Sequence, residues 1–271
     1  MELHAFTLPT GAKMTAWIHS DSPELTDAQC FCRPAVVVCP GGAYSMVSGR
    51  EKDPTAVEFF NMGAQVFVLE YSVGEGAADK RPLEELARTV LMVRQNASVW
   101  RVDPNRVVVI GFSAGGHLTG SLGVHWDDPE ILERCGVEDA KVLRPDGLIL
   151  CYPVLTMIDE LTHPLTKKNV MAGTKETQDY WSLETQVKAE TPPTFIWHTM
   201  EDKSVPVENS LLFVSALHRA GVSCEAHFFP YGAHGLSMCT KEVSSEDSHA
   251  RQWMPLCRKW LDVHFGPMIG A

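Results

Sequence analysis

Strand-like and helix-length segments alternate along almost the whole chain. Short apolar runs rich in β-branched residues are typical of strands buried in a parallel sheet. The strands predicted in this way are residues 35–39, 65–69, 106–110, 147–151, 194–198 and 224–229. The predicted helices are residues 53–62, 83–99, 114–125, 207–220 and 249–264. This order predicts an α/β fold in which helices cover both faces of a mostly parallel central sheet.

The first thirty residues differ from this pattern. They contain LHAFTL and KMTAWIH, which together predict an antiparallel hairpin at the edge of the sheet. The chain has no internal repeat, low-complexity tract or linker, and its 271 residues are within the range of one α/β core. We therefore expect residues 1–271 to form a single domain.

The segment VVVIGFSAGGHL, residues 107–118, is typical of a nucleophile elbow. A β-branched run ends at Gly111 and a helix-forming run follows Ser113. In the pattern G-x-S-x-G, the two glycines let a strand and a helix meet at a sharp turn, which holds the serine in a strained conformation. The N–H groups at the start of the helix favour negative charge beside the serine. The motif predicts acyl transfer with Ser113 as the nucleophile.

A serine nucleophile needs a base, and the base needs an acid that orients it. Asp202 follows the predicted strand PPTFIWHT, and His234 lies on a glycine-flanked loop after the predicted strand CEAHFFPYG. The chain order Ser113, Asp202, His234 is that of the α/β-hydrolases and differs from the chymotrypsin and subtilisin orders. Glu201, beside Asp202, is an alternative acid. We favour Asp202 because of its position relative to Val205-Pro206.

Two other histidines lie near these residues in the sequence. His198 is inside the predicted strand before Asp202, and His117 is on the helix that follows the elbow. We expect His198 to pack in the core or support the site indirectly, and His117 to pack the helix.

The donors that stabilise an oxyanion are expected at two places. One is the residue after the nucleophile, Ala114, and the other is a loop that follows an earlier strand. The segment AVVVCPGGAYS, residues 35–45, has a buried strand followed by Gly41-Gly42, which lets the backbone turn its N–H groups toward a substrate carbonyl. An ordinary glycine-rich loop is the alternative interpretation.

These segments resemble the α/β-hydrolases of the carbohydrate-esterase and acetyl-xylan-esterase-like kind. The matching stretches are VCPGGAYSMVSGRE, RVDPNRVVVIGFSAGGHL, CYPVLTM, TPPTFIWHTMEDKSVPVENSLLF and FFPYGAHGLS, within residues 35–238. The resemblance implies the catalytic triad Ser113, Asp202 and His234, and an oxyanion hole of backbone donors at Gly42, Ala43 and Ala114. Two departures from related esterases are Ala43, where many have a third glycine, and Pro40, where the HGGG type has histidine. Ala43 keeps the backbone N–H donor, so we expect this departure to change the shape of the acyl pocket more than catalysis.

A polar insertion, residues 156–191, separates two predicted strands. We expect it to form a small cap or one wall of the pocket. The alternative, which the sequence favours equally, is a surface segment that makes no contact with a ligand. Two aromatic residues are candidates for substrate binding: Tyr44, which follows the oxyanion loop, and Trp181, on the insertion. The insertion is too short for a lipase-type lid domain, so we expect a modest substrate.

Charge and cysteine content narrow the class of protein further. The net charge of −11 argues against a nucleic-acid partner. The N-terminal residues show no export signal, and no apolar run is long enough for a membrane span, so we expect a soluble cytoplasmic protein with no membrane partner. The eight cysteines are then expected to be reduced and mostly buried, and Cys30-Phe31-Cys32 has no second pair at zinc spacing.

The function expected from these features is that of a serine esterase. Its substrate would be a small-molecule or oligosaccharide ester that carries a short acyl group; the acetyl group and the sugar are implied by the resemblance. No cofactor and no metal are needed for this chemistry. One alternative is an amidase of the arylformamidase kind, or a small peptidase, with the same triad. A more remote alternative is a hydrolase fold retained for binding. The resemblance also allows a homodimer.

Overall fold

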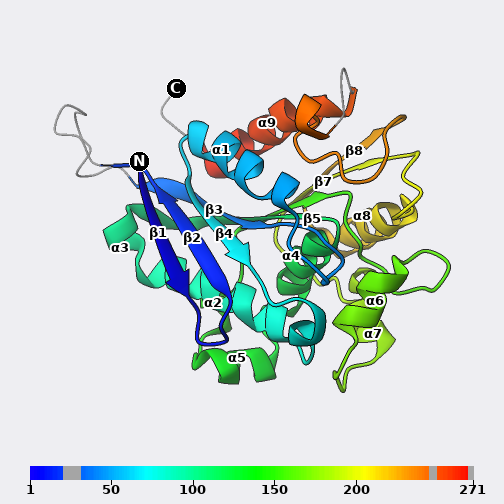
Figure 1. Ribbon diagram of the computed structural model, residues 1–271, viewed down its shortest axis with the longest axis horizontal. Coiled ribbons are helices and arrows are strands. Elements are labelled where there is room, and N and C mark those ends of the chain that lie inside the picture. The colour runs from blue at the N-terminus through cyan, green and yellow to red at the C-terminus, as the bar shows by residue number, and fades with distance from the viewer. Residues whose placement is uncertain (21–31, 244–248, 268–271) are drawn as a thin grey trace.

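An eight-stranded sheet forms the centre of the protein, with the strand order β1-β2-β4-β3-β5-β6-β7-β8 (Figure 1). The computed structural model describes residues 1–20, 32–243 and 249–267. The strands are β1 (Glu2–Thr7), β2 (Lys13–Ile18), β3 (Arg33–Cys39), β4 (Gln65–Glu70), β5 (Val102–Phe112), β6 (Gly147–Cys151), β7 (Thr194–Thr199) and β8 (Cys224–Phe229). Strands β3 to β8 are parallel, whereas β1 and β2 form an antiparallel hairpin whose second strand pairs with β4. The predicted fold class and the edge hairpin are confirmed.

Helices cover both faces of the sheet (Figure 1). They are α1 (Asp53–Asn61), α2 (Arg81–Gln95), α3 (Ala97–Trp100), α4 (Ala114–His125), α5 (Pro129–Cys135), α6 (Pro164–Val170), α7 (Gln178–Trp181), α8 (Glu208–Ala220) and α9 (Trp253–Phe265). Helices α1 and α9 pack on one face, and α2, α4 and α8 pack on the other.

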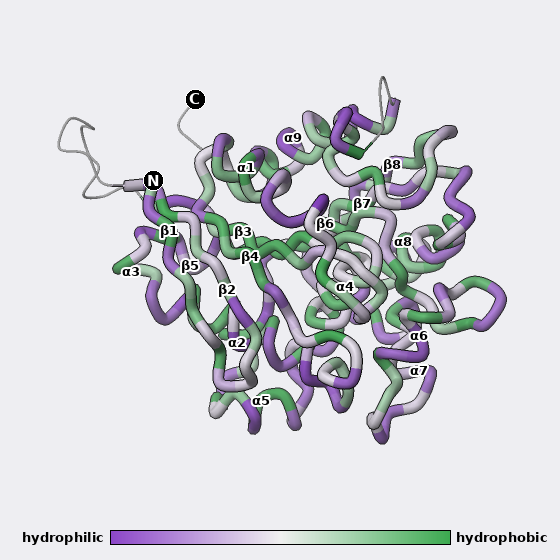
Figure 2. The backbone as a smooth tube through the Cα atoms, viewed as in Figure 1, coloured by the Kyte–Doolittle hydropathy of each residue, from purple (hydrophilic) through white to green (hydrophobic). Residues whose placement is uncertain are grey.

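The core follows from the alternation of side chains along the strands. In β3, Val36 and Val38 pack with α1 and α9, whereas Val37 and Cys39 pack with α2 and α4. Successive side chains of a strand point to opposite faces, so a strand that is apolar at every position is buried on both sides. Figure 2 shows this concentration of hydrophobic residues along β3 and β4.

The observed boundaries differ from the predicted ones at a few places. Strand β5 begins at Val102, four residues earlier than expected, because Arg33 of β3 pairs with Val102 before the register shifts. The helix expected over 83–99 begins at Arg81 and is divided at Asn96, which separates α2 from α3. The start of the last expected helix, residues His249–Gln252, is a 3₁₀ turn that leads into α9.

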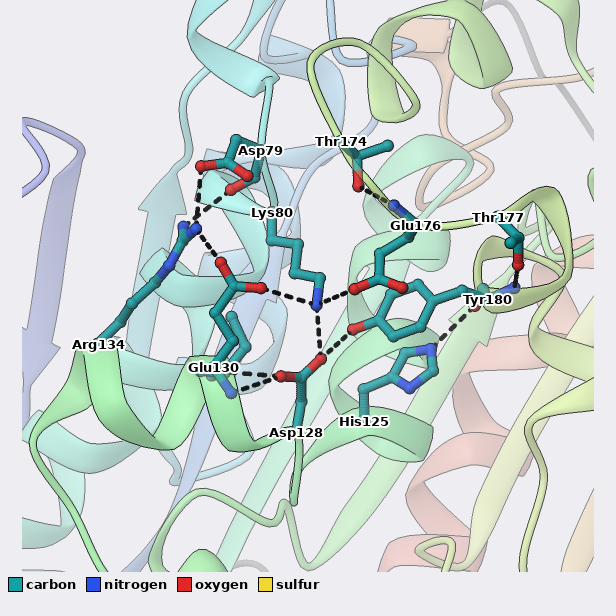
Figure 3. Close-up of polar contacts among 11 residues, drawn as sticks. Asp79, Lys80, His125, Asp128, Glu130, Arg134, Thr174, Glu176, Thr177 and Tyr180 are labelled. Atoms are coloured by element: carbon teal, nitrogen blue, oxygen red, sulfur yellow. Dashed lines mark hydrogen bonds and ion pairs between the residues drawn. The ribbon is translucent and has the colours of Figure 1, made fainter.

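A cluster of charges joins the insertion to the rest of the protein (Figure 3). Lys80, in the turn before α2, is only 4 % exposed and lies 2.9 Å from Asp128, 3.1 Å from Glu130 and 2.6 Å from Glu176. The hydroxyl of Tyr180 donates a hydrogen bond of 2.5 Å to Asp128. Glu176 and Tyr180 belong to the insertion, so the cluster fixes it to the turn before α2 and to the start of α5.

No disulfide links two cysteines of the described residues. Cys39, Cys151, Cys239 and Cys257 are buried, Cys135 and Cys224 are partly buried, and Cys32 is exposed. Burial raises the pKa of the Cys39 thiol to about 12. Cys30 and Phe31 of the segment Cys30-Phe31-Cys32 lie outside the described residues.

The parallel strands position the candidate site. Because β3 to β8 are parallel, their carboxyl ends lie at one edge of the sheet, where ligands bind in open α/β folds. Gly42 follows β3, Ser113 follows β5, Asp202 follows β7 and His234 follows β8. This topology brings residues that are far apart in the sequence to one place.

Candidate active site

Ser113 lies in a sharp turn between β5 and α4. Its φ of 53° and ψ of −118° are strained for a residue with a side chain. The turn is held because the N–H of Ser113 donates to the Cys151 carbonyl at 3.0 Å, and the Ser113 carbonyl accepts from Val154 at 3.1 Å. The side chain therefore projects from a rigid position at the start of a helix.

The two glycines of the elbow are required by close packing. A Cβ atom at Gly111 would lie 2.1 Å from the carbonyl oxygen of Gly115, and a Cβ atom at Gly115 would lie 2.1 Å from the carbonyl oxygen of Cys39. Both contacts are with backbone, which cannot move aside as a flexible side chain can. The strand and the helix meet this closely only because both positions lack side chains.

Ser113, His234 and Asp202 form a continuous chain of hydrogen bonds. His234 Nε2 lies 2.8 Å from Ser113 Oγ, and His234 Nδ1 lies 2.6 Å from Asp202 Oδ2. The imidazole is thus aligned between a hydroxyl and a carboxylate, with one nitrogen for each. Glu201, the alternative acid, points elsewhere and accepts a hydrogen bond of 3.3 Å from the Gly232 N–H.

The carboxylate of Asp202 is held in its ionised form. Its Oδ1 accepts hydrogen bonds of 2.9 Å from the N–H groups of Ser204 and Val205, and its Oδ2 lies 3.2 Å from His198 Nε2. Burial tends to raise the pKa of this carboxyl group, but the hydrogen bonds from His198 and His234 and the charge of His234 outweigh it and hold the pKa well below its ordinary value.

His198 and His117 are both fully buried. His198 supports Asp202 and also lies 2.8 Å from Ser210 Oγ through Nδ1. His117 lies 3.0 Å from the Tyr44 hydroxyl through Nδ1 and 3.0 Å from the Trp181 carbonyl through Nε2. Both have the supporting positions that their places in the sequence predict.

The loop after β3 has a backbone conformation suited to binding an anion. Ala43 and Tyr44 have φ values of 55° and 54°, in the left-handed region that residues with side chains seldom adopt. The carbonyl of Ala43 accepts a hydrogen bond of 2.8 Å from Asn169 Nδ2 of α6, and the Tyr44 carbonyl accepts one of 2.7 Å from the Gly74 N–H. Among the described residues, the N–H groups of Gly42 and Ala43 have no acceptor. They are free to donate to a ligand in the cavity.

A buried carboxylate joins two loops of the site. Glu51, which is 3 % exposed, accepts 2.7 Å hydrogen bonds from the Gly41 N–H and from the Tyr152 hydroxyl. The same hydroxyl accepts a hydrogen bond of 2.8 Å from the N–H of Ser237, three residues after His234. The Tyr152 ring also lies edge-on to the His234 ring, with their centroids 5.0 Å apart. Neither Glu51 nor Tyr152 is predicted from the sequence, although Tyr152 follows β6 directly, which is a position that favours a site residue.

A cavity of about 380 Å³ opens above these residues. It is lined by Ser113 and His234, by the proposed oxyanion residues Gly42 and Ala43, and by further polar and apolar groups. These are Ser45, Met46, Ser48, Arg50, Glu51, His163, Ser204 and Gly235. The volume is within the usual range for a small-molecule site.

Tyr44 and Trp181, expected to bind substrate, are not among the residues that line this cavity. Their side chains are 1 % and 2 % exposed. Tyr44 is turned inward to His117, and Trp181 packs against the same histidine with ring centroids 5.9 Å apart. The structure therefore places both behind the loop as packing residues, because the loop after β3 and the insertion bury their aromatic side chains against α4. The insertion reaches the cavity through His163 instead.

A larger cavity, of about 510 Å³, lies at the opposite end of the sheet near the start of β5. Its arginines are used within the protein: Arg94 pairs with Asp146 at 2.9 Å, and Arg144 donates a 2.7 Å hydrogen bond to the Glu190 carbonyl. The arrangement of nucleophile, base and acid identifies the smaller cavity as the candidate active site, whatever the relative volumes.

Among the described residues, no group of three or more histidine, cysteine, aspartate or glutamate side chains is placed to hold a metal ion. None of the described helices is long and apolar enough to cross a membrane.

Comparisons with known proteins agree with this geometry. Residues 25–217 match the BD-FAE family model. An endo-1,4-β-xylanase B from Butyrivibrio fibrisolvens is 40 % identical over 85 % of this chain, and an acetylxylan esterase from Xylanibacter ruminicola is 31 % identical over 76 %. The chain spans only 35 % and 42 % of the lengths of these two proteins.

Two solved structures share this architecture over at least 97 % of the chain. An acetyl ester-xyloside bifunctional hydrolase from Caldicellulosiruptor lactoaceticus superposes with a TM-score of 0.80 and 35 % identity, covering 97 % of this chain and 91 % of that one. A carboxylesterase from Lactobacillus plantarum superposes with a TM-score of 0.86 and 26 % identity, covering 100 % of both chains. The chain therefore belongs to the BD-FAE family of α/β-hydrolases.

Proposed function

We propose that this protein is a serine esterase that removes short acyl groups, above all acetyl, from sugars or oligosaccharides. The observation that carries the proposal is the hydrogen-bonded chain from Ser113 Oγ through His234 to Asp202, at 2.8 and 2.6 Å. These distances suit proton transfer from the hydroxyl to the imidazole. The names of the xylanase, acetylxylan esterase and xyloside hydrolase relatives support a sugar ester as the substrate.

In the proposed mechanism, His234 Nε2 takes the proton of Ser113 as Oγ attacks the ester carbonyl. Asp202 stays ionised and stabilises the imidazolium. The oxyanion of the tetrahedral intermediate accepts hydrogen bonds from the N–H groups of Gly42, Ala43 and Ala114. Collapse of the intermediate breaks the bond to the alcohol, which receives its proton from His234 and leaves an acyl-enzyme.

Water then repeats the sequence on the acyl-enzyme. His234 takes a proton from the water as the water oxygen attacks the acyl carbonyl. The second intermediate then collapses, its bond to Ser113 Oγ breaks, and His234 returns the proton to Oγ as the carboxylic acid is released. Because both half-reactions use the same donors, losing one oxyanion donor is expected to lower turnover about a hundredfold to a thousandfold.

We further propose that residues 1–271 act as one domain, with residues 156–191 as a small cap. Two contacts support the cap: His163 lines the cavity, and Asn169 donates to the Ala43 carbonyl of the oxyanion loop. A cytoplasmic location and a homodimer both stay predictions. Cell fractionation and the mass of the protein in solution, by sedimentation or light scattering, test them.

Hydrolysis of p-nitrophenyl esters from acetyl to octanoyl, with Ser113→Ala as the control, tests the esterase proposal. Acetylated xylo-oligosaccharide is assayed alongside for released acetate. We expect fast acetyl cleavage that falls steeply with acyl length and is lost in the variant. Ser113-dependent cleavage of N-formylkynurenine with no cleavage of any ester would favour the amidase alternative. Absence of all Ser113-dependent hydrolysis would leave only a binding role.

A further inference from the structure

His163 occupies the edge of the candidate active site where the insertion meets it. It directly precedes α6 and lines the same cavity as Ser113 and His234. Helix α6 continues to Asn169, which contacts the oxyanion loop at Ala43. The segment from His163 to Asn169 thus contributes an imidazole to the cavity that holds the base and a contact to the oxyanion loop.

One ring nitrogen of His163 is used to begin the helix. Its Nδ1 accepts a hydrogen bond of 3.3 Å from the Thr166 N–H and lies 3.0 Å from Thr166 Oγ1. A nitrogen that accepts from a backbone N–H carries no proton, so the neutral ring carries its proton on Nε2. Burial, with the charge of His234 added, lowers the pKa of His163 and outweighs the opposite effect of Asp202. The neutral form with Nε2–H is therefore the form present at neutral pH.

The Nε2–H group is available to a ligand. His163 Nε2 has no hydrogen-bond partner within the part of the chain that the structure describes. It is also absent from the buried side-chain atoms that lack a partner, so this nitrogen is accessible from the cavity that His163 lines. An unpartnered donor of a half-buried residue at a cavity wall can donate to a molecule that enters the cavity. Because its other nitrogen caps a helix, the direction of this donor is fixed before substrate binds.

We propose that His163 Nε2–H donates a hydrogen bond to a free hydroxyl of the sugar that carries the ester, and thereby favours esters of polyhydroxylated alcohols. This inference rests on the proposed esterase function. His234 delivers a proton to the departing alcohol, so the groups beside His234 face the alcohol part of the ester rather than the acyl oxygen. Ser204, whose N–H donates to Asp202, lines the same cavity. His163 is on this account a positioning residue for the leaving sugar.

Two substitutions separate the proposed donor from the helix cap. Asn in place of His163 keeps an acceptor near Nδ1, and asparagine is a good N-cap, but nothing replaces Nε2. Gln in place of His163 keeps an amide N–H near Nε2 and loses the short cap. Leu165→Ala, on the exposed side of the same turn, is the matched control because Leu165 is 43 % exposed and does not line the cavity.

The substrates differ in the hydroxyls that the donor needs. Monoacetylated methyl β-xyloside has free hydroxyls beside the ester, whereas cyclohexyl acetate has a ring of the same size with none. The measurement is the ratio of kcat/KM for the xyloside to kcat/KM for the cyclohexyl ester. We expect His163→Asn to lower this ratio about threefold to tenfold, which corresponds to one hydrogen bond, and His163→Gln to restore most of it. Leu165→Ala leaves the ratio at its original value.

The outcomes are distinguishable. If the unaltered enzyme cleaves the xyloside ester through Ser113 and the ratio is unchanged in His163→Asn, the inference is overturned and the esterase proposal stands. A low ratio in His163→Gln with a normal one in His163→Asn would mean that only the helix cap matters, which also overturns it. If the unaltered enzyme shows no Ser113-dependent cleavage of either ester, both proposals fail.

Discussion

His198 and Asp202 are joined through the same carboxylate oxygen that His234 contacts. His198 Nε2 lies 3.2 Å from Asp202 Oδ2 and 3.0 Å from the Val205 carbonyl, which can only accept a hydrogen bond. His198 Nε2 therefore carries a proton and donates, while Nδ1 faces the Ser210 hydroxyl at 2.8 Å. The proposed acid is held by a second, fully buried imidazole in addition to the proposed base.

Replacing His198 by phenylalanine is expected to lower both stability and activity. The change leaves a buried carboxylate oxygen, a carbonyl and a hydroxyl short of one partner each. We expect the free energy of unfolding to fall by about 1.5–3 kcal/mol, the range for a hydrogen bond to a charged group. Urea unfolding at pH 7 measures this loss in the free energy of unfolding. Ser210→Ala, which removes only the outer hydrogen bond, should cost about 1 kcal/mol, and an equal loss in both variants would contradict the role assigned to His198.

The stability that Asp202 contributes depends on pH in a direction set by its lowered pKa. Its ordinary pKa is 3.8, and the folded value is lower. The contribution is therefore complete above the unfolded pKa and is lost as the pH falls through the folded one. We expect the difference in unfolding free energy between the unaltered protein and Asp202→Asn to shrink as the pH falls below 4. A difference that grows over this acidic range would show that the sign is wrong.

Asn169→Ala tests whether the insertion supports the oxyanion loop. Asn169 Nδ2 donates the 2.8 Å hydrogen bond to the carbonyl of Ala43, whose φ of 55° is strained. Without this bond the loop is freer to leave its conformation, so we expect kcat for p-nitrophenyl acetate to fall about threefold to tenfold with little change in KM. Lys168→Ala, at the exposed neighbouring position, is the control. Equal kcat values in the two variants would remove the supporting role.

Lys80→Met tests the charge cluster that fixes the insertion. Removing the buried lysine leaves Asp128, whose side chain is 8 % exposed, without its cation. Breaking a buried ion pair from one side costs about 3–5 kcal/mol, and we expect a loss in that range by denaturant unfolding. The comparison is Lys52→Met, which breaks a pair with Glu70 whose side chains are 27 % and 36 % exposed and should cost less than about 1 kcal/mol. Similar losses in the two variants would show that the buried cluster contributes no more than a surface pair.

The sequence predicts the proposed triad well because each member follows a strand that is itself easy to identify. Ser113 has glycines at both sides of a sharp turn, and Asp202 and His234 come after apolar runs that end in polar, glycine-containing loops. Parallel strands bring such ends together, so three local signals specify one site.

The supporting residues are harder to predict because their partners are distant in the chain and no periodicity connects them. Glu51 is in a 3₁₀ turn and meets Tyr152, and Asn169 meets Ala43 across 126 positions. The burial of the Tyr44 and Trp181 side chains is hard to predict for a related reason. A loop or an irregular insertion gives no alternation from which the direction of a side chain can be deduced, whereas a strand or a regular helix does.

The contact of Glu51 with both Gly41 and Tyr152 joins two loops of the site. Gly41 precedes the proposed oxyanion donors, and Tyr152 holds Ser237 in the loop that carries His234. The loop that carries the proposed base and the loop that carries the proposed anion donors are thus held by one buried carboxylate. The alignment of His234 and that of the Gly42 and Ala43 N–H groups therefore depend on the same side chain, and the two halves of the site are not positioned independently.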